Sequence, residues 1–176
     1  ESNLSNYSDY IDTEAGFWGD RTPSTSGYSI NNSGGMGTTK TYYAPLIRLA
    51  INERPTFECS NDGDLYTVKG SSKGNKKLTY PVGLITADEV VLAGGFGGRS
   101  NESYYLYTGE IYRTMSPNSF IGSYAYVFQV DLNGSLNYTD VSVVDIAYGV
   151  RPVINLRGDL SVTGTGTSTD PYEVSL

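Results

Sequence analysis

The chain offers few residues that could carry out acid–base or nucleophilic chemistry. Histidine is absent from its 176 residues, which removes the commonest general base and the commonest metal ligand. Cys59 is the one cysteine, so neither a disulfide nor a cysteine-based zinc site can form within the chain. Two carboxylate pairs, Asp88 with Glu89 and Asp140 with Asp145, have a spacing that a glycosidase could use. The first pair fits a helix start, where the dipole favours acidic residues. We therefore expect no catalysis, no metal and no cofactor.

The composition and the net charge argue against nucleic acids as partners and against membrane insertion. The formal net charge is −7 and the pI is about 4.5, whereas binding to nucleic acid phosphates requires a basic face. No stretch reaches the ~18 apolar residues of a membrane span, so direct membrane insertion is not expected. Only 18% of the residues are charged, and solubility must come from Ser, Thr, Asn and Gly. The length fits one domain, residues 1–176.

The clearest helix signal lies at the start of residues 87–93. Thr86 and Glu89 have the spacing of a capping box, and Gly94-Gly95 supplies a helix stop. A short helix within residues 1–12 is the only other one expected. The prolines that follow Ala44 and Arg54 disfavour a long helix over residues 42–60.

Most other patterns predict short strands. Residues 124–130 (YAYVFQV) are aromatic and β-branched with alternating polarity. Asn133-Gly134 follows, a strong hairpin signal. Further strands are predicted at residues 65–68, 104–107, 110–115, 136–138, 141–144, 149–156 and 172–174. Together these patterns predict an α+β domain with mostly short antiparallel strands, one or two short helices and long irregular loops.

Several single residues have structural interpretations. Arg151 lies in an apolar strand, so we expect a salt bridge or hydrogen bonds to loop carbonyls. Trp18 and Cys59 are expected in the core. The stretch beginning at Asn61 (NDGD) reads as an Asx-type turn, because it lacks the full ligand pattern of a calcium loop.

Four motifs occur in a characteristic order: YPVGLITADEVVLAGG, YRTMSP, GVRPVINL and GTGTSTDPYEV. With this order, residues 13–176 resemble surface or secreted domains of Gram-positive and gut bacteria that have the C-type-lectin-like fold, shared with formylglycine-generating enzymes. The resemblance implies that fold, and for some members attachment to pilin-like N-termini. Formylglycine-generating activity would require a cysteine pair, and this chain has Cys59 alone.

A subset of C-type-lectin-fold proteins is diversified by retroelements that mutate adenines in a C-terminal template region. Residues 112–148 resemble such a display segment, which implies a variable recognition surface on a fixed scaffold. The predicted ligand-binding residues are Arg113, Asn118, Ser119, Ile121, Asp131, Leu132, Tyr138, Thr139, Asp140, Val143, Val144, Asp145 and Ile146.

The composition of this segment favours recognition on its own physical grounds. Tyrosine gives a large, rigid contact area at low entropic cost, while Ser and Asn give adaptable hydrogen bonds. We therefore predict a non-catalytic adhesin or receptor domain, extracellular or displayed on a cell surface. Its ligand would be a protein or glycan on another cell or on a host surface. Two alternatives stay open: a pilin-like or envelope subunit whose Tyr-rich face contacts another copy, and an inactive relative of an enzyme fold.

Overall fold

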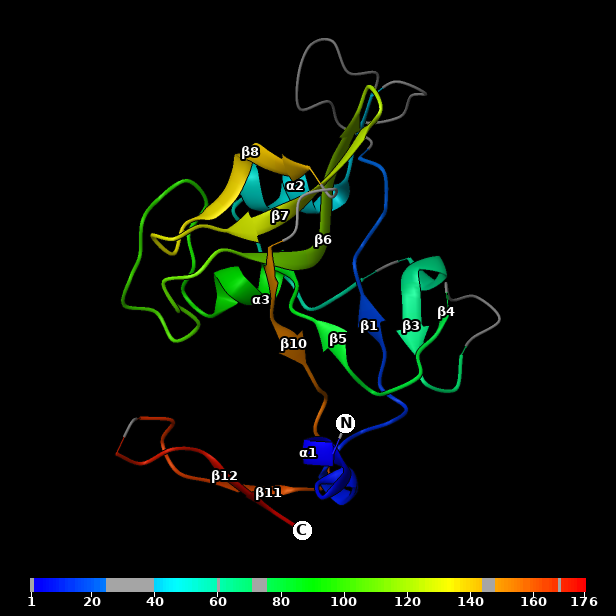
Figure 1. Cartoon of the computed structure of the whole chain (residues 1–176), viewed down its shortest axis with the longest axis vertical. Helices are drawn as coiled ribbons and strands as arrows, with labels where there is room; N and C mark the ends of the chain where they lie inside the picture. Colours follow the sequence, from blue (N-terminus) through cyan, green and yellow to red (C-terminus); the bar gives the residue numbers. More distant parts are fainter. Residues whose placement is uncertain (1, 25–39, 60, 71–75, 144–147, 168) are drawn as a thin grey trace.

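The structure is a computed structural model. It describes residues 2–24, 40–59, 61–70, 76–143, 148–167 and 169–176, while the side chains of 2, 3, 76 and 138–143 lie outside the description. The main sheet is curled and has five strands in the order β2-β6-β7-β8, with β9 paired to β6 (Figure 1). The strands are β2 (Lys40–Tyr42), β6 (Tyr112–Ile121), β7 (Tyr124–Val130), β8 (Leu136–Val143) and β9 (Gly149–Val150).

The inner face of this sheet carries the hydrophobic core. Tyr112 pairs with Val130, and Val130 with Leu136, and directly opposed residues of antiparallel strands point to the same face. These three side chains and Phe128 are buried together with residues of two short helices. The helices are α2 (Ala44–Ala50) and α3 (Ala87–Leu92).

The capping box predicted for α3 is confirmed. The hydroxyl of Thr86 accepts the backbone N–H of Glu89 at 3.1 Å, and the Glu89 carboxylate accepts the backbone N–H of Thr86 at 2.7 Å. α2 spans seven residues with Pro45 in its first turn, where a missing N–H costs nothing. The N-terminal region forms α1 (Ser2–Ser5) and the 3₁₀ turn η1 (Ser8–Tyr10).

The predicted Asn133-Gly134 hairpin is also confirmed. It joins β7 to β8, and the Asp131 N–H donates to the Ser135 carbonyl at 2.9 Å. Gly134 has φ +74°, and a Cβ there would lie 2.0 Å from the carbonyl oxygen of Asn101. This turn therefore requires glycine both for its conformation and for its close approach to a neighbouring loop.

Three small sheets complete the part of the fold that the structure describes. β1 (Phe17–Trp18), β3 (Leu65–Thr67) and β4 (Lys76–Lys77) form one. The other two pair β5 (Gly83–Leu84) with β10 (Pro152–Val153), and β11 (Ser161–Thr163) with β12 (Glu173–Ser175). The expected Asx turn leads into the 3₁₀ turn η2 (Asp62–Asp64): the side-chain oxygen of Asn61 accepts the N–H of Gly63 at 3.1 Å.

Two sequence predictions about residues beside the core of the main sheet need correction. The strand predicted over residues 104–107 is a turn closed by a 3.0 Å bond from the Tyr107 N–H to the Tyr104 carbonyl; the Tyr104 side chain is part of the core. For Arg151, the contact that the structure gives is aromatic: its guanidinium lies 4.9 Å from the centroid of the Tyr112 ring.

The α+β class is confirmed, with mostly antiparallel strands and short helices. None of the helices in the described ranges is long and apolar enough to cross a membrane.

Candidate functional site

The predicted display residues fall into three groups. Val144, Asp145 and Ile146 lie outside the described residues. Tyr138, Thr139, Asp140 and Val143 belong to β8, which the structure describes there by its backbone alone. Side chains are described for the other six: Arg113, Asn118, Ser119, Ile121, Asp131 and Leu132.

The prediction that Asn118 and Ser119 are exposed is wrong. Each is 1% exposed, and the Ser119 hydroxyl donates to the Asn118 side-chain oxygen at 2.9 Å. The β6–β7 register shifts on both sides of Pro117, and such an irregularity interrupts the in–out alternation of a strand, so two successive side chains point inward. Ile121 is half-buried and packs against the core. These three residues were predicted from the resemblance to a display segment, which gives no information about the bulge.

Arg113, by contrast, lies on the outer face of the sheet, and Asp131 is bonded to polar side chains of the two neighbouring strands. Arg113 of β6 opposes Gln129 of β7, and Gln129 opposes Asn137 of β8. The Gln129 amide donates to Asp131 Oδ1 at 2.5 Å, and the Asn137 amide donates to Asp131 Oδ2 at 3.1 Å. Val150 of β9 pairs with Arg113 on the other side. We call the four residues Val150, Arg113, Gln129 and Asn137 the outer row.

Exposed apolar and aromatic side chains lie within the outer row or follow it closely in contact or sequence. Tyr148 is 39% exposed, and its ring centroid lies 5.1 Å from the Arg113 guanidinium carbon, a cation–π contact. Val150 is 63% exposed, and Leu132, next to Asp131 in the sequence, is 58% exposed. The outer face thus combines rigidly placed polar groups with accessible apolar surface.

Gln129 stands out within the row because it is buried at 8% exposure and its side-chain Oε1 has no partner among the described residues. Buried polar groups are nearly always hydrogen-bonded. The bond from Gln129 Nε2 to Asp131 Oδ1 fixes the orientation of the amide, because the reversed orientation would bring two acceptor oxygens together. A water molecule would be stabilised beside the unpaired Oε1.

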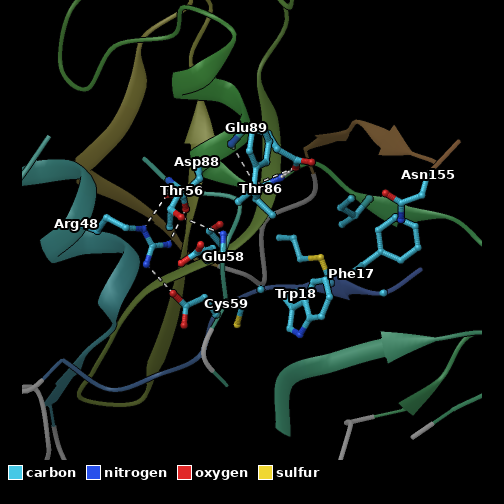
Figure 2. A pocket seen from close by; sticks show the side chains of 17 residues that line it. Phe17, Trp18, Arg48, Thr56, Glu58, Cys59, Thr86, Asp88, Glu89 and Asn155 are labelled. Carbon is cyan, nitrogen blue, oxygen red and sulfur yellow. Dashed lines mark hydrogen bonds and ion pairs between the residues drawn. The ribbon is translucent and has the colours of Figure 1, made fainter. Parts of the chain in front are cut away.

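A second candidate site is a cavity of about 210 Å³ between β1, α2 and the start of α3 (Figure 2). Trp18 borders it from β1, Arg48 from α2, and Thr86 and Asp88 from the N-terminus of α3. Segment 56–59 closes another side and contributes Cys59. Sequence reasoning missed this cavity because its walls come from six separate segments.

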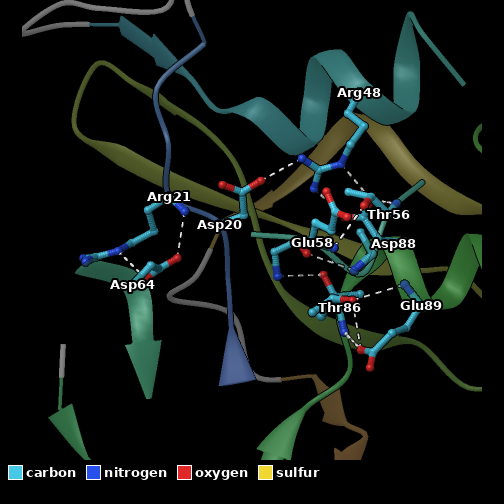
Figure 3. Close-up of polar contacts among 12 residues, drawn as sticks. Asp20, Arg21, Arg48, Thr56, Glu58, Asp64, Thr86, Asp88 and Glu89 are labelled. Carbon is cyan, nitrogen blue, oxygen red and sulfur yellow. Dashed lines mark hydrogen bonds and ion pairs between the residues drawn. The ribbon is translucent and has the colours of Figure 1, made fainter. Parts of the chain in front are cut away.

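Arg48 joins two buried carboxylates beside this cavity (Figure 3). Its Nη1 donates to Asp20 Oδ2, and its Nε and Nη2 donate to Asp88 Oδ1 and Oδ2, all at 2.7 Å. The Thr56 backbone N–H also donates to Asp88 Oδ1, at 3.0 Å. Burial alone would lower the pKa of Arg48, but the bonds and charges of Asp88 and Asp20 outweigh it and raise the pKa further above its ordinary value. Arg48 is therefore a permanent cation.

Asp20 adopts a left-handed backbone conformation with φ +59°, which costs on the order of 1 kcal/mol in a residue with a Cβ. Ion pairs hold both the strained residue and the residue that follows it. Asp20 itself binds Arg48, and the next residue, Arg21, donates its backbone N–H and its Nε to the buried carboxylate of Asp64, each at 2.7 Å. These contacts offset the strain and fix this wall of the cavity.

Cys59 and Trp18 are half-buried in the cavity wall, so their expected place in the core is wrong. Burial raises the pKa of the Cys59 thiol. Two smaller effects also act on this pKa: the bond to the Asn61 carbonyl lowers it, and the negative charge of Asp20 raises it. A raised pKa keeps the thiol protonated near neutral pH, and the protonated form is a poor nucleophile.

The chemistry of the cavity is therefore limited. Asp20 and Asp88 are bound to Arg48, and Glu89 is committed to the capping box. Glu58, the remaining acidic residue of the wall, is exposed. Within the described part of the chain there is also no group of three or more acidic or cysteine side chains that could hold a metal ion.

Comparison with known proteins gives no relative: no family model, no curated protein and no solved structure matches this chain.

Proposed function

We propose that this chain is a non-catalytic ligand-binding domain of the C-type-lectin-like type, and that the outer face of its main sheet is the recognition surface. The observation that carries the proposal is the outer row, in which three adjacent strands place Arg113, Gln129 and Asn137 side by side with Asp131.

The composition of this face suits recognition. Arginine and tyrosine are the residue types that most often dominate binding energy, and Arg113 is already stacked on Tyr148. Because the strand ladder fixes the backbone of the row, ligand binding would cost little ordering entropy. Leu132 and Val150 add exposed apolar area beside it.

The ligand class that fits is a protein or glycan on another cell or a host surface, met outside the producing cell. The polar groups of Arg113 and Asp131, which are both partly exposed, can form hydrogen bonds with hydroxyl or amide groups, and the rings and apolar side chains can contact the faces of sugars or nonpolar side chains.

A non-catalytic role is supported by the cavity beside Arg48. A catalytic carboxylate pair needs two acids in different, functional protonation states, whereas Asp20 and Asp88 are both tied to one permanent cation. The protonated thiol of Cys59 adds no nucleophile at neutral pH.

The proposal is tested by applying the labelled domain to an array of mammalian and bacterial glycans and to immobilised extracellular matrix proteins. Arg113→Ala and Leu132→Ser should weaken each interaction at least tenfold, while Tyr105→Ser, which removes an 86% exposed tyrosine from another segment, should leave it unchanged. Far-UV circular dichroism confirms that each variant is folded. If all three variants bind equally well, the outer face is not the recognition surface.

Diversification by a retroelement is the finer part of the proposal and needs a different measurement. Sequencing the encoding locus across many cells of one population should show variation at codons between residues 112 and 148. Variable codons should include those of Arg113, Asp131 and Leu132, and exclude those of the buried Asn118 and Ser119. A uniform segment without a template repeat or reverse transcriptase gene nearby would leave a binding domain of fixed specificity.

A further inference from the structure

The C-terminal hairpin has an apolar face that is exposed to solvent. β11 and β12 pair antiparallel, with Val162 opposite Val174, so these two side chains point to the same face. By the two-residue period of strands, Tyr172 and Leu176 belong to that face as well. The exposed fractions of these four side chains are 58% for Val162, 36% for Val174, 67% for Tyr172 and 69% for Leu176.

The opposite face of the hairpin is polar. Ser161 pairs with Ser175, and Thr163 lies opposite Glu173. Strict alternation of this kind is typical of a strand pair with one buried face. Since an isolated two-stranded hairpin is at best marginally stable in water, both the pattern and the energetics call for an apolar surface that covers Val162 and Val174.

The same chain carries a recessed apolar surface at the same end of the molecule. A groove of about 740 Å³ runs between the N-terminal segment and residues 78–82. Its apolar wall is made by Leu4, Ile11, Leu78, Tyr80, Pro81 and Val82. Tyr80 and Leu4 of this wall are 50% and 38% exposed, so the apolar surface is open to solvent, and contiguous exposed apolar surface marks interaction sites.

The hairpin and the groove are neighbours in the fold. Ile11, in the groove wall, forms a β-bridge with Leu156, and the Arg157 N–H donates to the Tyr10 carbonyl at 3.0 Å. The chain leaves the body at this point and continues into β11, which projects beside α1 (Figure 1). Because the hairpin starts next to the groove yet exposes its apolar face, it does not cover its own groove.

We infer that two copies of this chain associate by exchanging these hairpins, so that Val162, Val174 and Tyr172 of each copy enter the apolar groove of the other. A second copy fits because the projecting and recessed apolar surfaces occur together on one chain. Their adjacency allows a two-fold axis to form both contacts at once, which closes the assembly as a dimer. A stable dimer of this kind needs about 800 Å² of buried surface per partner.

Analytical ultracentrifugation of the full chain from 1 µM to 1 mM tests this inference. The wild type should show a concentration-dependent monomer–dimer equilibrium. Val162→Thr with Val174→Thr retains β-branched residues but makes the face polar, and it should weaken dimerisation at least a hundredfold. Ser161→Thr with Ser175→Thr, the matched change on the polar face, should leave it unchanged. A wild type that stays monomeric at 1 mM would overturn the inference.

A mixing experiment identifies the groove as the receiving surface. Tyr80→Ser should weaken self-association at least a hundredfold, as the hairpin double variant should. Because the hairpin variant keeps its groove and Tyr80→Ser keeps its hairpin, an equimolar mixture should form a heterodimer through one intact contact. A dimer that is insensitive to Tyr80→Ser would instead show that hairpins pair with one another, and would overturn the exchange. Unchanged urea unfolding midpoints for the variant monomers show that the variants are folded.

Discussion

Arg48 on α2 and Asp88 at the start of α3 form a bidentate ion pair, with both nitrogen–oxygen distances at 2.7 Å. The pair joins the two helices that lie under the main sheet, and Asp88 is almost wholly buried. A guanidinium and a carboxylate in this planar geometry make the strongest type of side-chain hydrogen bond. The contact therefore connects the cavity wall to the core.

Asp88→Asn should destabilise the domain by about 3 kcal/mol, because it leaves the half-buried Arg48 cation short of a counter-charge. Urea unfolding at pH 7 measures the change. Asp159→Asn is the matched control: Asp159 also binds an arginine, Arg157, through two bonds, but that pair lies at the surface and its loss should not shift the midpoint measurably. Equal effects of the two substitutions would contradict a structural role for the Arg48–Asp88 pair.

The capping box of α3 gives a second prediction. Thr86→Ala removes the hydroxyl that accepts the Glu89 N–H, and should lower the free energy of unfolding by about 1 kcal/mol. Thr86→Ser retains the hydroxyl and should stay within a few tenths of a kcal/mol of the wild type. Thermal unfolding followed by circular dichroism checks both. If alanine and serine behave alike, the cap does not stabilise the helix.

Two glycines with positive φ allow backbone strain and steric clash to be separated. Gly122 has φ +65° and open space where a Cβ would lie, whereas a Cβ on Gly134 would lie 2.0 Å from the Asn101 carbonyl oxygen. Gly122→Ala should cost only the left-handed strain, about 1–2 kcal/mol. Gly134→Ala should cost more than this, because a backbone carbonyl must also move. The urea unfolding midpoint of Gly134→Ala should therefore be lower than that of Gly122→Ala. The reverse order would contradict the close contact between Gly134 and the Asn101 carbonyl.

Local signals in the sequence were sufficient for α3 and for the β7–β8 hairpin. The Thr86 hydroxyl and the Glu89 carboxylate act three residues apart, and the positive φ of Gly134 belongs to the turn between β7 and β8. The residue types and spacing within each short segment were enough to identify both features. The α+β class followed from the same short-range patterns.

Features that depend on distant contacts were not predictable in this way. Asn118 and Ser119 are buried by a bulge whose position is set by pairing with β7. Asp88 was assigned to the helix dipole, yet its main partner lies 40 residues away on α2. Arg48 did offer a signal, because it is the only charged residue of an otherwise apolar helix, and such a residue requires a buried counter-charge.

The thiol of Cys59 supplies the last prediction. Burial raises the pKa of this thiol in the folded state above its value in the unfolded chain. The resulting contribution to the free energy of unfolding is fully present at a pH below the pKa of the unfolded chain. It is lost as the pH rises through the pKa of the folded state. Since the thiolate is the form that reacts, alkylation by iodoacetamide should be slower in the folded protein than in urea at pH 8. Its pH midpoint should also lie higher in the folded protein. No second cysteine complicates the measurement. A folded midpoint at or below that of the unfolded chain would place Cys59 outside the cavity wall, in contact with water.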